Sequence, residues 1–294
     1  MIASWPGRID LPNLLFSAVE TLESDRMTMD RDAAIDPGRT IDWSRTSADY
    51  AQHRPGPPDS FFARLQALGV GLPGQRILDL GTGTGLIARR LAKQGAKVAG
   101  IDIATGQLAQ ARRAAEAEGL AIDFREAPAE DPPFSDGSFD AVTANQCWLY
   151  FDKARLLPRL RRLLAQGGLI AVSHFSWLPR RDPIAAATEA IVLKHNPAWT
   201  GKDWDGEVPV PPAWMTPDLE VRGFFVYDEA IPFTAESWRG RIRACRGVGA
   251  SLEPEAVAAV DRDLAQWLAA HAGERFTVLH RPDATILGFR EPAV

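Results

Sequence analysis

The chain has 294 residues, of which 46% are hydrophobic and 24% charged, a composition that is typical of globular proteins and excludes extensive disorder. Its length suits one domain with an insertion or two small domains. A net charge of −5 gives no basic surface and argues against a nucleic-acid partner. With no apolar run of about 18 residues, no export signal and only two cysteines, we expect a cytoplasmic protein with no membrane partner and no disulfide framework.

Weak hydrophobic periodicity and scattered charges mark residues 1–40, where we expect an N-terminal arm and not a domain. Met27 and Met29 lie in this arm, so the sequence leaves the start of translation open between them and Met1. Three prolines then end any helix in residues 41–58.

Strands and helices alternate from residue 76 onward. Apolar stretches predict strands at 76–80, 97–101, 122–125, 139–144 and 169–173, and amphipathic or alanine-rich stretches predict helices at 86–93, 107–118 and after Asp152. Such alternation indicates right-handed βαβ units and therefore a parallel sheet. We expect this α/β core to occupy residues 41–175.

The alternation ends after residue 175. Residues 176–222 combine one short helix with an irregular stretch rich in proline and tryptophan. An insertion of this kind, leaving the edge where α/β sheets bind ligands, predicts a lid. Residues 223–294 are expected to complete the core with a strand at 223–227, a covering amphipathic helix at 253–271 and a closing hairpin of strands at 276–279 and 285–289.

A glycine-rich turn, Asp79-Leu80-Gly81-Thr82-Gly83-Thr84-Gly85, joins the first predicted strand to the first predicted helix. Glycines there permit a tight turn and close approach of a ligand, and the helix N-terminus behind them favours polar or anionic groups. The second strand ends at Asp102, whose carboxylate can accept hydrogen bonds from ribose hydroxyls. The dinucleotide fingerprint G-x-G-x-x-G fails because Leu86 stands in its last place, so a nucleoside cofactor other than NAD is favoured.

The pattern D-x-G-x-G-x-G resembles motif I of the class I S-adenosylmethionine-dependent methyltransferases, and further segments resemble that family's later motifs in order: 98–103, 127–131, 136–142 and 162–169. Together they cover about residues 45–175 and are similar to small-molecule enzymes with a methyltransferase-11-like domain. The resemblance implies a Rossmann-like, doubly wound seven-stranded sheet whose last strand is antiparallel, with a lid inserted after strand five. It also implies S-adenosyl-L-methionine as cofactor and in-line methyl transfer to a small-molecule acceptor.

The same resemblance implies a cofactor site. Asp102 would bind the ribose, Arg54 the methionine carboxylate, and Tyr50 would close over the cofactor. The predicted cofactor-binding residues are Tyr50, Arg54, Asp79, Gly81, Thr82, Gly83, Gly85, Asp102, Ile103, Gln107, Ala129, Glu130, Asn145 and Gln146.

Candidate catalytic and substrate residues lie near the strand ends. His174 ends the fifth predicted strand and is either a general base or a hydrogen-bonded wall residue. Five aromatic residues are candidates for substrate contact, with core packing as the alternative: Trp148, Phe175, Trp177, Trp199 and Trp204. Four arginines predict a solvated basic face, or one of them binds a substrate carboxylate: Arg239, Arg241, Arg243 and Arg246. Cys147 and Cys245 are expected to be buried, unreactive thiols, and no metal-ligand spacing is present.

The sequence thus predicts a methyltransferase for a small-molecule acceptor. One alternative is a regulatory module that binds S-adenosylmethionine or S-adenosylhomocysteine without turnover. Another is a protein or nucleic-acid methyltransferase, which the acidic charge disfavours. Neither the acceptor atom nor the oligomeric state can be inferred from the sequence.

Overall fold

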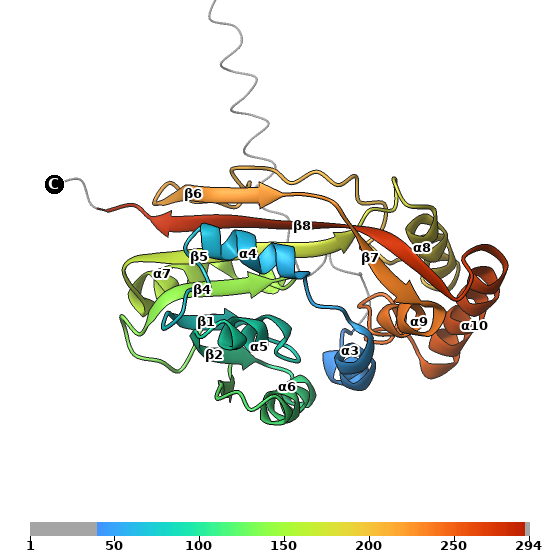
Figure 1. The fold of residues 1–294 in the computed structure, drawn as a ribbon, viewed down its shortest axis with the longest axis horizontal. Helices are drawn as coiled ribbons and strands as arrows, with labels where there is room; N and C mark the ends of the chain where they lie inside the picture. The colour runs from blue at the N-terminus through green and yellow to red at the C-terminus, as the bar shows by residue number, and fades with distance from the viewer. Residues whose placement is uncertain (1–39, 292–294) are drawn as a thin grey trace, which may run out of the picture. The chain divides into compact units, whose positions relative to one another are not determined.

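The computed structural model describes residues 40–291 (Figure 1). The predicted arm therefore lies, apart from its last residue, outside the described part of the chain. The elements in chain order are η1 (Trp43–Thr46), α3 (Ser47–His53), α4 (Asp59–Ala67), β1 (Arg76–Leu80), α5 (Leu86–Lys93), β2 (Lys97–Asp102), α6 (Thr105–Ala117), β3 (Asp123–Glu126), β4 (Phe139–Asn145), η2 (Trp148–Tyr150), α7 (Lys153–Leu163), β5 (Leu164–Trp177), α8 (Pro183–His195), β6 (Leu219–Val226), β7 (Glu229–Thr234), α9 (Ala235–Arg243), α10 (Pro254–His271) and β8 (Arg275–Phe289).

The strands form one sheet in the order β3-β2-β1-β4-β5-β8-β6, and β7 also pairs with β8. Strands β1 to β5 are parallel, and the last strand, β8, runs antiparallel to β5. The predicted Rossmann-like α/β architecture is confirmed, with β7 as an eighth strand beyond the seven predicted. The strand order reverses between β1 and β4, so a ligand crevice is expected at their carboxyl ends.

Each face of the sheet is buried by a separate apolar cluster. Successive strand residues point to opposite faces, so Ile77 and Val98 join side chains from α4, α5 and α6, whereas Leu78 and Ala99 join side chains from α7. Burial on both faces explains why every residue of β1 from Ile77 to Leu80 is buried instead of every second one.

Strand β8 replaces the predicted closing hairpin, whose turn was expected at residues 280–284. The first part of β8 pairs with β7 as far as His280, and the last part pairs with β6 from Asp283 onward. Between these two pairings the carbonyl of Pro282 accepts a hydrogen bond from Tyr227 N (3.2 Å). In an antiparallel strand, the N–H and the C=O of one residue point toward the same neighbouring strand. The nitrogen of Pro282 therefore points toward the place where β7 ends and β6 begins, so its missing N–H removes no hydrogen bond between strands.

A third apolar cluster lies beyond the end of β5, among α8, α9, α10, β7 and the first part of β8. We call these elements the cap; Figure 1 shows them gathered at the β7 end of the molecule. The cap is larger than the predicted lid at 176–222, because α9 and α10 belong to it. Conversely, β5 continues through Trp177 and Leu219–Val226 is strand β6, so the irregular stretch is limited to 196–218.

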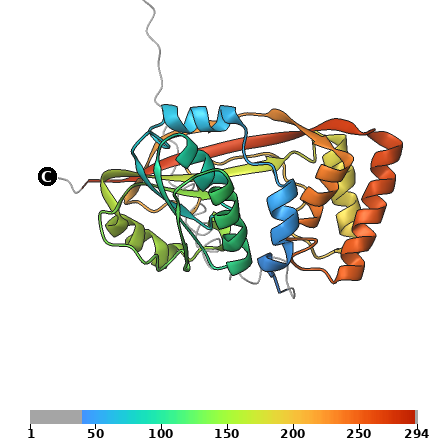
Figure 2. The same ribbon diagram turned by 60° about the horizontal axis from the view of Figure 1, so that its bottom comes forward.

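Helix α3 links the core to the cap, lying between α6 and α9 (Figure 2). Gly240 of α9 permits this packing, because a Cβ at that position would lie 2.1 Å from Cδ2 of His53. Pro55 follows the C-cap residue Arg54 and holds it in extended backbone (φ −78°, ψ 113°), which ends α3 at the boundary between core and cap.

Candidate active site

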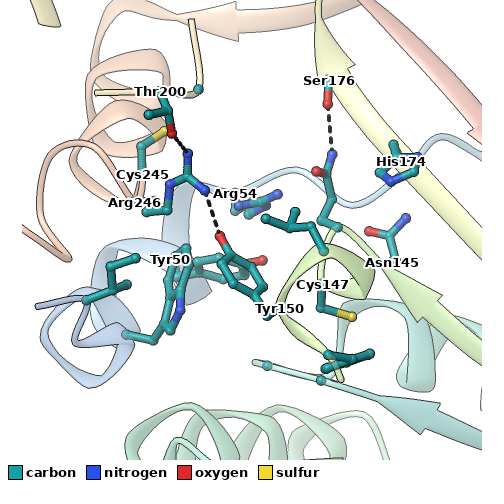
Figure 3. Close-up of a pocket in the computed structure, with 18 of the residues that line it drawn as sticks. Tyr50, Arg54, Asn145, Cys147, Tyr150, His174, Ser176, Thr200, Cys245 and Arg246 are labelled. Atoms are coloured by element: carbon teal, nitrogen blue, oxygen red, sulfur yellow. Dashed lines mark hydrogen bonds between the residues drawn. The ribbon is translucent and has the colours of Figure 1, made fainter. Parts of the chain in front are cut away.

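A cavity of about 860 Å³ opens at the carboxyl ends of β1, β2, β4 and β5. Helix α3, the segment 199–209 and the end of α9 form its remaining walls, and Figure 3 shows side chains from these elements converging on it. Small-molecule and cofactor sites typically occupy roughly 300–1,000 Å³. The cavity therefore lies at the ligand-binding edge of the sheet, and its volume is in the upper part of that range.

Most of the predicted site residues line this cavity: Tyr50, Arg54, Gly81, Gly83, Asp102, Ile103, Gln107, Ala129, Glu130, Asn145, Gln146, His174, Trp177, Trp199 and Trp204. Five predicted residues do not line it: Asp79, Thr82, Gly85, Trp148 and Phe175. Three of these five, Asp79, Thr82 and Phe175, border a smaller neighbouring pocket together with Tyr50 and Arg54.

The glycine loop adopts a backbone that only glycine accommodates readily. Gly81, Gly83 and Gly85 have φ values of 57°, 56° and 75°. A Cβ on Gly81 would approach Cys147 Sγ at 3.0 Å, whereas a Cβ on Gly83 would meet nothing closer than 3.9 Å. Gly81 is therefore required for packing and Gly83 leaves open space for a ligand, while Gly85 closes the turn into α5.

Asp79 supports this loop from beneath. Its carboxylate is 2% exposed and accepts hydrogen bonds from Thr82 Oγ1 and Thr143 Oγ1, both at 2.7 Å. Burial, only partly offset by these two bonds, raises the pKa of Asp79 to about 6. Asp79 and Thr82 were predicted to bind the cofactor directly, but their mutual hydrogen bond and burial place them behind the loop instead of on the wall of the main cavity.

Asp102 lies at the end of β2 and faces the cavity. One carboxylate oxygen accepts the N–H of Gly83 and the other accepts the N–H of Ala104, each at 2.8 Å. Burial raises the pKa of Asp102, and the backbone hydrogen bonds oppose that rise. The carboxylate is thus fixed in position, and each oxygen retains a lone pair for a further donor.

Two polar side chains lie at the carboxyl end of β4. Asn145 donates to Ser173 Oγ (2.9 Å) and Gln146 donates to Ser176 Oγ (3.2 Å; Figure 3), so both amides are held against the end of β5. Gln146 has a φ of 65°, which is uncommon for a residue other than glycine, and it lines the cavity.

Gln107, on α6, presents an unsatisfied acceptor beside Gly83. Its Nε2 donates to the carbonyl of Trp43 (3.2 Å), but its buried Oε1 has no hydrogen-bond partner in the part of the chain that the structure describes. Buried acceptors are nearly always satisfied in folded proteins, so this oxygen is a candidate acceptor for a ligand donor.

The remaining predicted site residues make contacts that support the fold. Glu130 lines the cavity, but its Oε1 accepts the N–H of Asp152 (2.7 Å), which caps α7. Trp148 was a candidate either for substrate contact or for the core; it is 3% exposed, packs on Trp214 with ring centroids 4.7 Å apart, and belongs to the core. Phe175 likewise packs inward, against His280.

His174 and Asp283 form a hydrogen-bonded pair on the cavity wall, with His174 Nδ1 3.0 Å from Asp283 Oδ1. They face each other because they are register partners in the antiparallel pairing of β5 with β8. The Asp283 side chain is only 2% exposed and that of His174 is 40% exposed. A carboxylate only accepts, so Nδ1 carries the hydrogen of this bond, and in a neutral imidazole the lone pair is then on Nε2. Asp283 was missed because the sequence placed it in a turn.

Comparison with known proteins agrees with this geometry. Residues 78–172, which run from β1 into β5, match the methyltransferase domain family. This part of the chain therefore carries a methyltransferase domain similar to that of the class I S-adenosylmethionine-dependent methyltransferases. It is 48% identical over 109 residues to the demethylmenaquinone methyltransferase of Thermus thermophilus, an alignment that covers 36% of this chain and 50% of that protein.

A second curated relative is the ubiquinone biosynthesis O-methyltransferase of Dinoroseobacter shibae, 37% identical over 132 residues (45% of this chain and 53% of that protein). The chain spans about half the length of the curated relatives that it matches. A solved structure from Anaeromyxobacter dehalogenans, provisionally named a type II methyltransferase, shares the fold with a TM-score of 0.54 at 23% identity, over 82% of this chain and 99% of that one.

Three tryptophans line the cap side of the cavity, but they differ in burial. Trp199 is 5% exposed and packs in the cap cluster, so it is a core residue with one edge on the cavity. Trp177 is also buried and donates from Nε1 to Glu189 Oε1 (2.7 Å), a carboxylate whose pKa burial raises. Trp204 is half-buried in the irregular stretch. Of the three, Trp204 is the one best placed to contact a ligand without supporting the fold.

The arginines of α9 do not form the predicted solvated face. Arg239 pairs with Asp261, and Arg243 pairs with Asp49 and with Asp261. Arg241 is 6% exposed and borders the cavity. Arg246, in the turn after α9, donates to Tyr150 Oη (3.4 Å) and Thr200 Oγ1 (3.0 Å), a bridge across the cavity mouth that is visible in Figure 3.

Both cysteines are free thiols. Burial raises the pKa of the Cys147 thiol well above its usual value, and its Sγ lies 3.2 Å from the carbonyl oxygen of Leu80. Within residues 40–291, no group of three or more His, Cys, Asp or Glu side chains is arranged to hold a metal ion. No helix among those residues is both long and apolar enough to cross a membrane.

Proposed function

We propose that this protein is an enzyme that binds S-adenosyl-L-methionine and transfers its methyl group to a hydroxyl group of a small-molecule acceptor. The observation that carries the choice of a hydroxyl acceptor is the His174–Asp283 pair, which supplies a base on the cavity wall (3.0 Å between Nδ1 and Oδ1). A cytoplasmic location, expected from the sequence, is part of the same proposal.

The chemistry of the cavity wall fits the cofactor. Asp102 retains lone pairs for the two ribose hydroxyls after accepting its two backbone hydrogen bonds. Arg54 borders both the main and the smaller pocket and forms no ion pair with another described residue, which suits a methionine carboxylate. The unsatisfied Oε1 of Gln107 can accept a further donor. When bound, S-adenosylmethionine supplies an activated methyl group on a sulfonium, so no covalent enzyme intermediate is needed.

His174 would accept the proton that the acceptor hydroxyl loses as its oxygen is methylated. Asp283 orients the imidazole through Nδ1, which leaves Nε2 as the basic nitrogen, and its buried negative charge stabilises the imidazolium that forms. The cap would exclude water and hold the acceptor in line, and positioning of this kind contributes much of the rate enhancement in group transfer.

The relatives support a small-molecule acceptor. Two of them are named as methyltransferases of demethylmenaquinone and of ubiquinone biosynthesis, and the second is named an O-methyltransferase. Because the alignments cover about half of each relative, they support the cofactor part of the site more directly than the acceptor part, which this chain builds from its own cap.

The experiment that tests this function measures formation of S-adenosylhomocysteine with methyl-labelled cofactor and a panel of phenols, alcohols and amines. We expect turnover with a hydroxyl acceptor, a loss of about 100-fold or more in kcat for His174→Gln and of about tenfold or more for Asp283→Asn. S-adenosylhomocysteine affinity should stay within about twofold in both variants.

A matched control exists in the cap, where His195 Nε2 lies 2.8 Å from Asp263 Oδ2 but neither residue borders the cavity. Asp263→Asn should leave kcat unchanged. Binding of S-adenosylhomocysteine with no turnover of any acceptor would instead favour the cofactor-binding regulatory module. Unchanged kcat in His174→Gln would remove the general base from the proposal.

A further inference from the structure

Two arginines that face the cavity have no acidic partner. Arg54 at the end of α3 and Arg241 on α9 both line it. Within residues 40–291, no carboxylate oxygen lies within 4.0 Å of either guanidinium, although the neighbouring Arg239 and Arg243 on α9 are both paired with acids. These two guanidinium charges on the cavity wall are not paired with an acid among the described residues.

Arg241 is the more unusual of the two. It is 6% exposed, its guanidinium carbon lies 4.9 Å from the centroid of the Trp177 ring, and its Nη1 lies 3.0 Å from Cys245 Sγ. A thiol is a weak acceptor, and a ring face offsets only part of the lost hydration. Burial, followed by the nearby charge of Arg54, lowers the pKa of Arg241. A buried guanidinium without an anion is costly to the fold, so its presence favours an anion that arrives with a ligand.

The two arginines face different parts of the cavity. Arg54 stacks over the Tyr50 ring at 4.6 Å and also borders the small pocket behind the glycine loop with Gly81, which is the side assigned to the cofactor. Arg241 borders only the main cavity and lies over Trp177, at the cap end of β5 and near the end of the strand that carries His174. Both arginines thus line the same cavity, Arg54 toward the glycine loop and Arg241 toward the cap.

We propose that Arg241 binds an anionic group of the acceptor, so that the enzyme methylates a hydroxyl of a small aromatic carboxylate. This inference rests on the proposed function and adds the substrate class. The planar guanidinium offers a bidentate, charge-assisted site for a carboxylate, and Trp177 and Trp204 supply apolar walls for the rest of the molecule. The carboxylate could otherwise come from the methionine part of the cofactor, and the test separates the two sources.

The experiment measures binding of benzoate and of its uncharged counterpart benzyl alcohol to the S-adenosylhomocysteine complex, by tryptophan fluorescence and calorimetry. We expect wild type to prefer benzoate, and Arg241→Met to weaken benzoate by about tenfold or more while leaving benzyl alcohol unchanged. Without ligand, Arg241→Met should melt at the same temperature as wild type or higher, because it removes a buried, unpaired charge. Arg239→Met, on the same helix but outside the cavity, should keep benzoate affinity and melt lower.

The source of the carboxylate is resolved by comparing S-adenosylhomocysteine with methylthioadenosine, which lacks the amino acid part. If Arg241→Met weakens S-adenosylhomocysteine but not methylthioadenosine, Arg241 serves the cofactor and the inference is overturned while the proposed function stands. Absence of any benzoate preference in wild type also overturns it. Should Arg241→Met fail to fold, Arg241→Lys keeps the charge without the planar fork and should lose benzoate affinity in part. Failure of wild type to bind S-adenosylhomocysteine would instead refute the proposed function.

Discussion

Replacing Asp102 by alanine should weaken S-adenosylhomocysteine binding and leave the fold intact. Each hydrogen bond to a charged acceptor contributes about 1.5–3 kcal/mol net. In the alanine variant, water can hydrogen-bond to the ribose hydroxyls and so recover part of the free energy lost with the two bonds. We therefore expect a loss of about 1.5–3 kcal/mol, or roughly 10- to 100-fold in affinity. The structure places the loss near the upper end of that range, because Gly83 N and Ala104 N also lose their acceptor (2.8 Å each) and the glycine loop is then held less firmly.

Asparagine at position 102 sharpens the test. Each oxygen of Asp102 already accepts one backbone N–H, so an amide nitrogen in either place would meet a donor instead of an acceptor. Asp102→Asn should therefore weaken binding by a similar amount despite its matching shape. Asp123→Asn, on the exposed edge strand β3, is the control and should have no effect. Calorimetry of S-adenosylhomocysteine measures all three; unchanged affinity in a folded Asp102→Ala protein would mean that the ribose is held elsewhere.

Further tests concern pH and the cap. Asp79 has a pKa of about 6, above the value of roughly 3.9 expected when unfolded, so wild type should lose up to about 3 kcal/mol of unfolding free energy as pH rises from 4 to 6. Asp79→Asn should lack this loss in urea titrations, and parallel pH profiles for the two proteins would contradict the assignment. Trp199→Ala should lower the unfolding free energy by about 3–5 kcal/mol, because the ring is a core residue of the cap. Trp204→Ala should instead slow methyl transfer with little change in melting temperature, and the reverse ranking would show that the irregular stretch supports the fold.

Local sequence determined the α/β core and the cofactor side of the cavity. Strand β1 and helix α5 have the predicted bounds, because a buried strand, three glycines and an amphipathic helix follow one another within 18 residues. The glycine loop and Asp102 meet because parallel strands β1 and β2 end at the same edge of the sheet, which sequence order and right-handed crossovers already imply. Local signals suffice where the ligand is bound by consecutive strand ends.

Tertiary structure alone decided the other side of the cavity. Asp283 lies 109 residues after His174, and Pro282 beside it suggested a turn; only the change of partner along β8, from β7 to β6, lets the strand continue through that proline. Arg241 looked like one of four exposed arginines, but it is 6% exposed and its guanidinium lies against the Trp177 ring of β5 and Cys245 Sγ. Both outcomes depend on contacts between segments distant in the chain, which hydrophobic periodicity does not encode. The partner of the base and the buried cation of the cavity therefore follow from strand register and helix packing.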